Sequence, residues 1–200
     1  MTPAISILLP ARARPPHLRA SVESCFALAA QPANVEVLVR LDGDDPHLGE
    51  ELAILAALRG QYGEVLVWTG PRLGYRAMHV YFNGLAERAR GQWLVNWNDD
   101  MKWVSRGWDA LLLDAPPYCV QMPRRDIAAT SDTTVPVIGR PWYETLGHLS
   151  LNAYCDAWIA DVSAYAGTTV ARDDIVFHHE RLDDATLREQ AGNGETERLK

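Results

Sequence analysis

The 200-residue sequence lacks several features that would indicate particular classes of protein. It has only three cysteines and no CxxC pair, which argues against a zinc cluster or a dithiol redox motif. Asp and Glu outnumber Lys and Arg by 26 to 19, so a surface built mainly to attract phosphate backbones is not expected. The one apolar run near the start, Ile5 to Leu9, has no basic segment before it and is too short to span a bilayer. We therefore expect neither a signal peptide nor a transmembrane segment.

What remains is the composition of a globular protein, with 48% hydrophobic and 22% charged residues. A chain of this length can bury one sizeable core, so we expect a single domain over residues 1–191. Residues 192–200 are polar and without apolar periodicity, and we expect them to form a disordered tail. Cys25, Cys119 and Cys155 lie far apart in apolar surroundings, which is typical of reduced core thiols and favours a cytoplasmic location.

The first half of the chain alternates between short apolar runs and helical periodicity. The patterns predict strands at 4–9, 35–41, 64–68 and 92–97, separated by helices at 15–30, 48–58 and 75–90. Later patterns predict helices at 105–114 and 154–165 and short strands at 118–122, 135–138 and 175–177. This alternation is typical of an α/β fold, in which a mostly parallel central sheet is flanked by helices on both faces. Ligands of such sheets bind at the carboxyl ends of the strands.

The strongest local pattern is Asn98-Asp99-Asp100, directly after the predicted strand at 92–97. Two adjacent carboxylates repel each other, and a divalent cation is the usual compensation. The alternative is a solvated Asn-Asp-Asp turn that caps the following segment. The motifs at the other strand ends favour the first interpretation.

Those motifs have a fixed order along the chain. They are Pro10-Ala11-Arg12, Leu41-Asp42-Gly43, Leu73-Gly74-Tyr75-Arg76 and the Asp99-Asp100 pair. Their order and spacing resemble family 2 glycosyltransferases, closely over residues 5–109 and more loosely as far as residue 179. The resemblance implies the Rossmann-like GT-A fold. It also implies an inverting, metal-dependent enzyme that takes a sugar from a nucleotide-diphosphate sugar, with a UDP-sugar favoured over GDP- or dTDP-linked donors.

The resemblance also assigns donor-binding roles to individual residues. It implies that Asp42 lies at the uracil or ribose of the donor and that the turn from Pro10 to Arg12 frames the base. Arg76 would face the nucleotide phosphates, although a surface helix arginine is the alternative. Asp99 would contact the ribose.

The implied cofactor is Mn2+ or Mg2+, bridging the donor diphosphate and bound by Asp100. A late histidine, His178 or His179, is the second implied ligand. Side chains alternate along a strand, so at most one of the two imidazoles should reach the metal. The sequence departs from the family at Asn98, where many members have another Asp.

The implied general base is Asp156, within Tyr154-Cys155-Asp156-Ala157-Trp158. An inverting enzyme needs a carboxylate that takes the acceptor proton. The alternative is that Asp156 is only the N-cap of the helix that follows, since Asp is a favoured N-cap. Asp161 and Glu144 are weaker candidates for the base.

Two other functions and the acceptor stay open. One is a catalytically silent nucleotide-sugar-binding module on the same scaffold, because fold alone does not define function. The other is a sugar-nucleotide nucleotidyltransferase, although the segment from Pro10 to Pro15 lacks the glycines typical of that class. The acceptor is a glycan, a protein, a metabolite or a modified nucleic-acid base. Residues 136–140 with Trp142 and Tyr143 form either its binding wall or part of the core.

Overall fold

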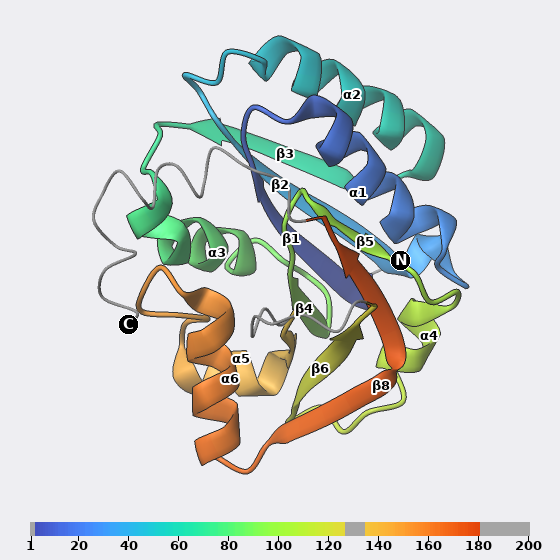
Figure 1. The fold of residues 1–200 in the computed structure, drawn as a ribbon, viewed down its shortest axis with the longest axis vertical. Helices are drawn as coiled ribbons and strands as arrows, with labels where there is room; N and C mark the ends of the chain where they lie inside the picture. Colours follow the sequence, from blue (N-terminus) through green and yellow to red (C-terminus); the bar gives the residue numbers. More distant parts are fainter. Residues whose placement is uncertain (1–2, 127–134, 181–200) are drawn as a thin grey trace.

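The computed structural model describes residues 3–126 and 135–180, and one mixed β-sheet runs through them (Figure 1). Its strands are β1 (Ile5–Ala11), β2 (Val35–Asp42), β3 (Val65–Gly70), β4 (Trp93–Asn96), β5 (Met101–Trp103), β6 (Val120–Arg125), β7 (Val137–Gly139) and β8 (Thr169–His179). In space their order is β3-β2-β1-β4-β7-β6-β8-β5. Pairing is parallel among β3, β2, β1 and β4 and between β6 and β8, and antiparallel at β7 and β5. The predicted, mostly parallel sheet is confirmed.

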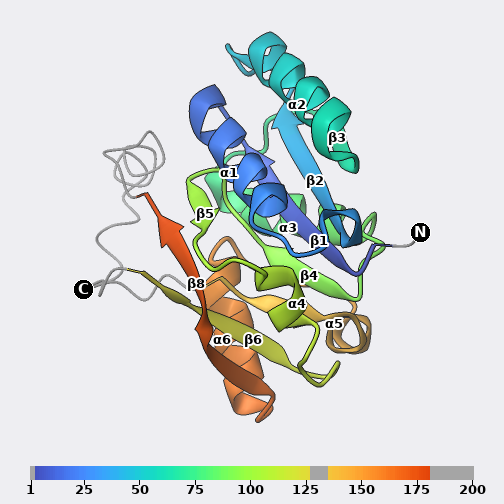
Figure 2. The ribbon, with the colours of Figure 1, turned by 90° about the vertical axis from the view of Figure 1, so that its right-hand side faces the viewer.

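Helices cover both faces of this sheet. They are α1 (Pro15–Ala27), α2 (Leu48–Tyr62), α3 (Met78–Ala86), α4 (Trp108–Leu112), α5 (Arg140–Leu146) and α6 (Cys155–Tyr165), with 3-10 turns η1 (Pro32–Asn34) and η2 (Tyr75–Ala77). Helices α1, α2 and α4 contribute to one core cluster, and α3, α5 and α6 to a second cluster on the opposite face. Figure 1 shows α1 and α2 on one side of β1 and β2 and α3 on the other, and in the turned view of Figure 2 α1 and α2 lie in the upper part of the molecule. The architecture is therefore three-layered, as the alternation predicts.

The central strands read as continuous apolar runs because both of their faces are buried. Alternate residues of β1 and β2 belong to different clusters: Ile7 and Val39 pack toward α1 and α2, whereas Leu8 and Leu38 pack toward α3. All four side chains are fully buried. Burial on both faces fixes the register of the strands, and with it the places where their carboxyl ends meet the loops.

An aromatic stack lies beneath the segment that follows β4. Trp103 stacks on Trp97 at a centroid distance of 4.6 Å and on Trp108 at 4.5 Å. The indole Nε1 of Trp97 donates to Ser21 Oγ at 2.8 Å, and this hydroxyl donates in turn to the backbone oxygen of Asn98 at 3.2 Å. Through Ser21, helix α1 and the aromatic stack therefore hold the backbone of the Asn98-Asp99-Asp100 segment in place.

Helix α3 is shorter than the helix predicted at 75–90. Where that helix would continue, side chains of the sheet accept hydrogen bonds from the backbone N–H groups. The N–H of Arg90 donates to Glu36 Oε1 at 2.7 Å, and the N–H of Gly91 donates to Ser6 Oγ at 2.8 Å. A Cβ on Gly91 would lie 2.7 Å from the backbone nitrogen of Ser6. The chain must therefore leave the helix after Ala86 in order to pass β1 closely.

Several short elements differ from their predicted extents. Strand β5 and helix α5 are not predicted, because three and seven residues are too few for a period to show. The strand predicted at 175–177 is the end of the eleven-residue β8, whose first half is polar and is defined by long-range pairing with β6. Helices α1 and α4 are shorter than predicted.

Other expectations concern the cysteines, the membrane and the tail. Cys25, Cys119 and Cys155 are buried and unpaired, as expected for core thiols. Within residues 3–126 and 135–180, no helix combines the length and apolar character needed to cross a membrane. The predicted tail at 192–200 lies outside the described residues.

We predict that Trp103→Ala lowers the free energy of unfolding by about 3–5 kcal/mol, because it removes the middle ring of the aromatic stack and leaves a cavity. Urea unfolding followed by circular dichroism measures the change. Trp68→Ala is the matched control, since Trp68 is only partly buried, and it should lose less. Equal losses in the two variants would show that the aromatic stack contributes no more to the free energy of unfolding than a partly buried tryptophan does.

Candidate functional site

The polar loops after β1, β2 and β4 meet at one edge of the sheet. These three strands are parallel neighbours, so their carboxyl ends lie side by side. The loops begin at Arg12, Gly43 and Trp97. Such an edge is where open α/β sheets bind ligands.

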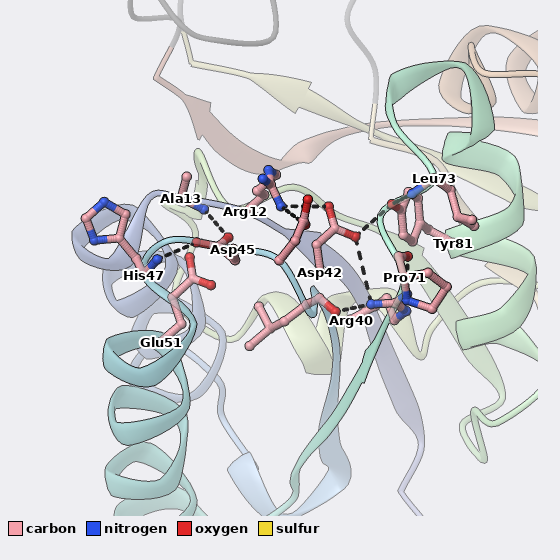
Figure 3. Close-up of polar contacts among 12 residues, drawn as sticks. Arg12, Ala13, Arg40, Asp42, Asp45, His47, Glu51, Pro71, Leu73 and Tyr81 are labelled. Carbon is pink, nitrogen blue, oxygen red and sulfur yellow. Dashed lines mark hydrogen bonds and ion pairs between the residues drawn. The ribbon is translucent and has the colours of Figure 1, made fainter.

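Asp42, the last residue of β2, is the centre of one polar cluster (Figure 3). The hydroxyl of Tyr81 on α3 donates to Asp42 Oδ1 at 2.8 Å, and Arg12 Nη1 donates to Asp42 Oδ2 at 3.3 Å. The N–H of Leu73 donates to the Tyr81 hydroxyl at 2.7 Å. Burial and the neighbouring Asp42 raise the pKa of Tyr81, which keeps its hydroxyl protonated. Asp42 thus ties β2 to α3, to the loop after β1 and to the segment before η2.

A second set of carboxylates shapes the loop after β1. Asp45 accepts hydrogen bonds from the N–H of Ala13 at 2.6 Å and of His47 at 2.7 Å. Ala13 has φ 57°, in the left-handed region that non-glycine residues rarely adopt. Glu51 on α2 accepts from the N–H of Arg14 at 3.3 Å. These bonds hold the loop in a strained conformation that aims the arginine side chains at the strand ends.

Arg14 bridges the two carboxylates that follow β4. Its Nε donates to Asp99 Oδ2 at 3.2 Å and its Nη2 to Asp99 Oδ1, while its Nη1 donates to Asp100 Oδ2 at 3.2 Å. Asp99 and Asp100 are only 2% and 6% exposed. The guanidinium therefore grips Asp99 with two hydrogen bonds and extends to its neighbour.

The two carboxylates differ in their affinity for protons. Burial, the largest influence, and the charge of Asp100 raise the pKa of Asp99 to about 7 despite the neighbouring Arg14. Burial also acts to raise the pKa of Asp100, but His179 and Arg14 outweigh it, and this pKa is lowered. Asp100 is therefore the carboxylate that stays ionised.

Strand β8 brings one histidine to Asp100. His179 Nε2 lies 3.3 Å from Asp100 Oδ1, and the N–H of Glu180 donates to the backbone oxygen of Asp100 at 2.9 Å. His178 instead contacts Asp126, with 2.7 Å between Nδ1 and Oδ2. The alternation along β8 thus directs the two imidazoles to different partners.

The protein atoms around Asp100 meet only some of the requirements of a site for a divalent cation. Asp100 Oδ1 is buried and has no hydrogen-bond partner among the described residues, and the same is true of His179 Nδ1. A carboxylate oxygen beside an imidazole suits Mn2+ or Mg2+. Within residues 3–126 and 135–180, however, no group of three or more His, Cys, Asp or Glu side chains is arranged to hold a metal. A cation at Asp100 would need further ligands from a bound molecule.

Arg76 and Asp156 belong to two segments that meet through a pair of tyrosine rings. Arg76 is exposed in η2, and Asp156 is half-buried in the first turn of α6. The rings of Tyr75 and Tyr154 meet edge to face with centroids 6.3 Å apart, which joins η2 to the start of α6. The N-cap of α6 is Tyr154, so the alternative that Asp156 is only an N-cap is wrong.

The other acidic candidates and the candidate acceptor wall are less well placed. Glu144 and Asp161 are exposed on α5 and α6. Gly139 pairs with Trp93 at the amino end of β4, so residues 136–140 lead away from the ligand edge. Trp142 is 5% exposed within a core cluster. The burial of Val137, Ile138 and Trp142 supports core packing for these residues, and a role of this segment in acceptor binding stays a prediction.

Arg14 and Tyr81 are the site residues that the sequence patterns did not single out. Arg14 stands two residues after Arg12, and this spacing was the available signal for a second arginine directed to the strand ends. Tyr81 lies in a helical pattern in which its apolar ring accounts for the periodicity. Its hydroxyl contact with Asp42 depends on the tertiary packing of α3 and left no sequence signal.

The chain has the GT-A fold of glycosyltransferases, as comparison with solved structures shows. It is similar to the mannosyltransferase PcManGT from Pyrobaculum calidifontis in complex with GDP-Man and Mn2+, at TM-score 0.75 and 13% identity over 95% of this chain and 60% of that one. It is also similar to residues 1–349 of S. aureus TarS in complex with UDP-GlcNAc, at TM-score 0.73 and 8% identity over 92% of this chain and 60% of that one.

A third similar structure is GalNAc-T7 with UDP, GalNAc and Mn2+, at TM-score 0.72 and 15% identity over 90% of this chain and 44% of that one. The chain thus spans 60% or less of the length of each of these three structures. Neither a family model nor a curated protein matches the sequence. The fold implied by the resemblance to family 2 glycosyltransferases is confirmed.

We predict that Glu51→Gln stabilises the protein above pH 6. Burial, with a contribution from Asp45, raises the pKa of Glu51 to about 6 from 4.5 in the unfolded chain. The folded state therefore favours the protonated form, and the associated stability is present below pH 4.5 and lost as the pH rises through 6. The neutral glutamine avoids this loss, which is at most about 2 kcal/mol.

Urea midpoints at pH 4.5 and pH 7.5 measure the effect. The variant should be more stable than the wild type at the higher pH and nearly equal to it at the lower one. A constant difference across this range would show that Glu51 does not titrate between the two states.

Proposed function

We propose that the chain is an inverting, metal-dependent glycosyltransferase that uses a nucleotide-diphosphate sugar, with a UDP-sugar as the favoured donor. The observation behind this proposal is that Asp42, at the end of β2, and Asp99 and Asp100, directly after β4, lie at the ligand edge of a GT-A fold. The three similar structures are named for complexes with GDP-Man, UDP-GlcNAc or UDP. Their identities are low, so they support a nucleotide-sugar donor without fixing its base.

In this proposal the polar cluster around Asp42 receives the nucleoside. Asp42 and Asp99 contact the base and the ribose, and the turn from Pro10 to Arg12 frames the base. Both oxygens of Asp42 already accept a hydrogen bond, but each has a further lone pair for the ligand. Arg76 is the proposed partner of the phosphates. The preformed network with Tyr81 would lower the cost of ordering this subsite on binding.

Asp100 and His179 are the proposed protein ligands of Mn2+ or Mg2+. When bound, this cation would neutralise the charge that develops on the nucleoside diphosphate leaving group. His178 is not a ligand in this proposal, because it contacts Asp126. Two protein ligands leave positions that only the donor oxygens and water can fill, so the cation should bind together with the donor.

Asp156 is the proposed general base. Its carboxylate would take the proton of the acceptor hydroxyl as the acceptor oxygen attacks the anomeric carbon and the nucleoside diphosphate leaves from the opposite face. Support comes from its position in the first turn of α6, which the pair of Tyr75 and Tyr154 joins to η2 near the donor-binding edge.

We predict that Asp100→Ala abolishes the increase in UDP affinity that Mn2+ causes in the wild type. Titration calorimetry with UDP, with and without Mn2+, measures this increase, and a parallel screen of nucleotide sugars for donor hydrolysis identifies the preferred base and sugar. Asp114→Ala is the matched control, because Asp114 is exposed after α4, away from this edge. An undiminished effect of Mn2+ in Asp100→Ala would contradict the metal assignment, and no affinity of the wild type for any nucleotide would contradict the function.

We also predict that Asp156→Asn lowers transfer by about 10²–10⁴-fold, the usual contribution of general-base catalysis. UDP affinity should stay nearly unchanged, because the base does not touch the nucleotide. The melting temperature should also stay nearly unchanged, because asparagine keeps the shape of the side chain. Asp161→Asn, measured in parallel, tests the weaker candidate. Full transfer in Asp156→Asn would remove Asp156 from the mechanism, and full nucleotide binding without any transfer in the wild type would favour a silent binding module.

A further inference from the structure

The guanidinium of Arg14 is hydrogen-bonded to the two carboxylates at which the proposed cation would bind. It contacts Asp99 through Nε and Nη2 and Asp100 through Nη1. Of the four carboxylate oxygens in this pair, three accept a hydrogen bond from this one side chain, and the fourth, Asp100 Oδ1, faces His179. The protein thus supplies its own positive charge to the buried pair.

A guanidinium in this position opposes a divalent cation in two ways. It donates to Asp100 Oδ2 at 3.2 Å and so takes up one of the two lone pairs of this oxygen, which makes it a poorer metal ligand. A cation on Asp100 Oδ1 would also lie close to the positive charge of Arg14, with little solvent between them, because Asp99 and Asp100 are almost fully buried. Arg14 and a divalent cation therefore compete for one carboxylate.

The arginine is the more exposed partner in this contact. The side chain of Arg14 is 27% exposed, against 2% for Asp99 and 8% for Asp100. The carboxylates are fixed from both sides, by the hydroxyl of Ser21 on the backbone of Asn98 and by the N–H of Glu180 on the backbone of Asp100.

The backbone of Arg14 is also held in place. Its N–H donates to Glu51 at 3.3 Å, and Pro15 at the start of α1 restricts the residue. The side chain can therefore leave the carboxylates without any movement of the loop. A guanidinium binds phosphate oxygens with the same fork geometry that it uses for carboxylates.

We propose that Arg14 is an internal counter-ion that closes Asp100 to divalent cations until a diphosphate draws the guanidinium away. This inference rests on the proposed function, and it adds a regulation of the same site. Without nucleotide, Arg14 neutralises the acidic pair and Mn2+ binds weakly. With a nucleoside diphosphate, Arg14 moves to the phosphate oxygens, and the cation takes its place at Asp100. Nucleotide and cation then bind cooperatively, because each needs the same displacement of Arg14.

The test is a calorimetric titration of Mn2+ into the nucleotide-free protein. Arg14→Gln removes the competing charge and should bind Mn2+ about tenfold or more tightly than the wild type. In the presence of UDP the gap should narrow, since Arg14 has then already left the carboxylates in the wild type. Arg19→Gln is the matched control: Arg19 lies on α1, the helix that begins directly after Arg14, is half exposed and pairs only with Glu23 among the contacts described. Its Mn2+ affinity should equal that of the wild type.

Two further measurements keep the test decisive. Arg14→Gln leaves two buried carboxylates uncompensated and should lower the melting temperature, and Mn2+ should restore it by more than it raises that of the wild type. If Arg14→Gln folds poorly, Arg14→Lys replaces it: the ammonium cannot bridge both carboxylates, so Mn2+ should bind more tightly than in the wild type.

Unchanged or weaker Mn2+ binding in the folded Arg14 variants would overturn the inference. Nucleotide binding by the wild type is a separate outcome. If UDP binds with Mn2+ but the Arg14 variants gain no affinity for the cation, only this inference fails. If the variants gain affinity for Mn2+ and the wild type binds no nucleotide, the counter-ion role stands and the proposed function fails.

Discussion

Two adjacent carboxylates held almost fully out of water, Asp99 and Asp100, impose the main physical constraint on this structure. Charges buried so closely need positive partners, because removing them from solvent is costly. Arg14, after the first strand, supplies positive charge, and the last strand brings the His179 imidazole to 3.3 Å from Asp100. Much of the surrounding architecture serves to bring these two residues to one place.

The order of the strands explains how this is done. The parallel pairing of β1 with β2 and β4 places Asp42, at the end of β2, and the loops that contain Arg14 and Asp99 at one edge. The short strand β5 then continues directly from Asp100 and pairs antiparallel with the end of β8, so that Met101 lies opposite His179. The C-terminal half thereby supplies His179 and Glu180 as contacts of Asp100.

The sequence predicted the parts of the fold that depend on local pattern. Apolar runs such as Ile5 to Leu9 predicted the central strands, because burial on both faces leaves a continuous signal. Carboxylates at strand ends, Asp42, Asp99 and Asp100, were found for the same reason, since polar residues directly after such runs must lie at the ligand edge. Contacts that depend on distant partners were not predictable. Examples are the contact of Asp100 with His179 and not with His178, and the hydrogen bond from the N–H of Arg90 to Glu36 beyond the end of α3.

The contact between Arg14 and the acidic pair belongs to this second group. The sequence showed an adjacent pair of carboxylates and implied a metal, because a metal is the compensation that the family resemblance supplies. It did not show that a side chain 85 residues earlier already provides positive charge there. The functional role of Asp156 stays a prediction, because its placement in the first turn of α6 excludes the N-cap alternative without bringing it to a reacting atom.

A crystal structure of the protein grown with UDP and Mn2+, with the anomalous signal of manganese used to locate the ion, tests this account most directly. The account predicts manganese on Asp100 and His179, the uridine against Asp42 and Asp99, and the guanidinium of Arg14 on the diphosphate instead of on Asp100. Nucleotide bound away from the carboxyl ends of β1, β2 and β4, or manganese bound elsewhere, would contradict it.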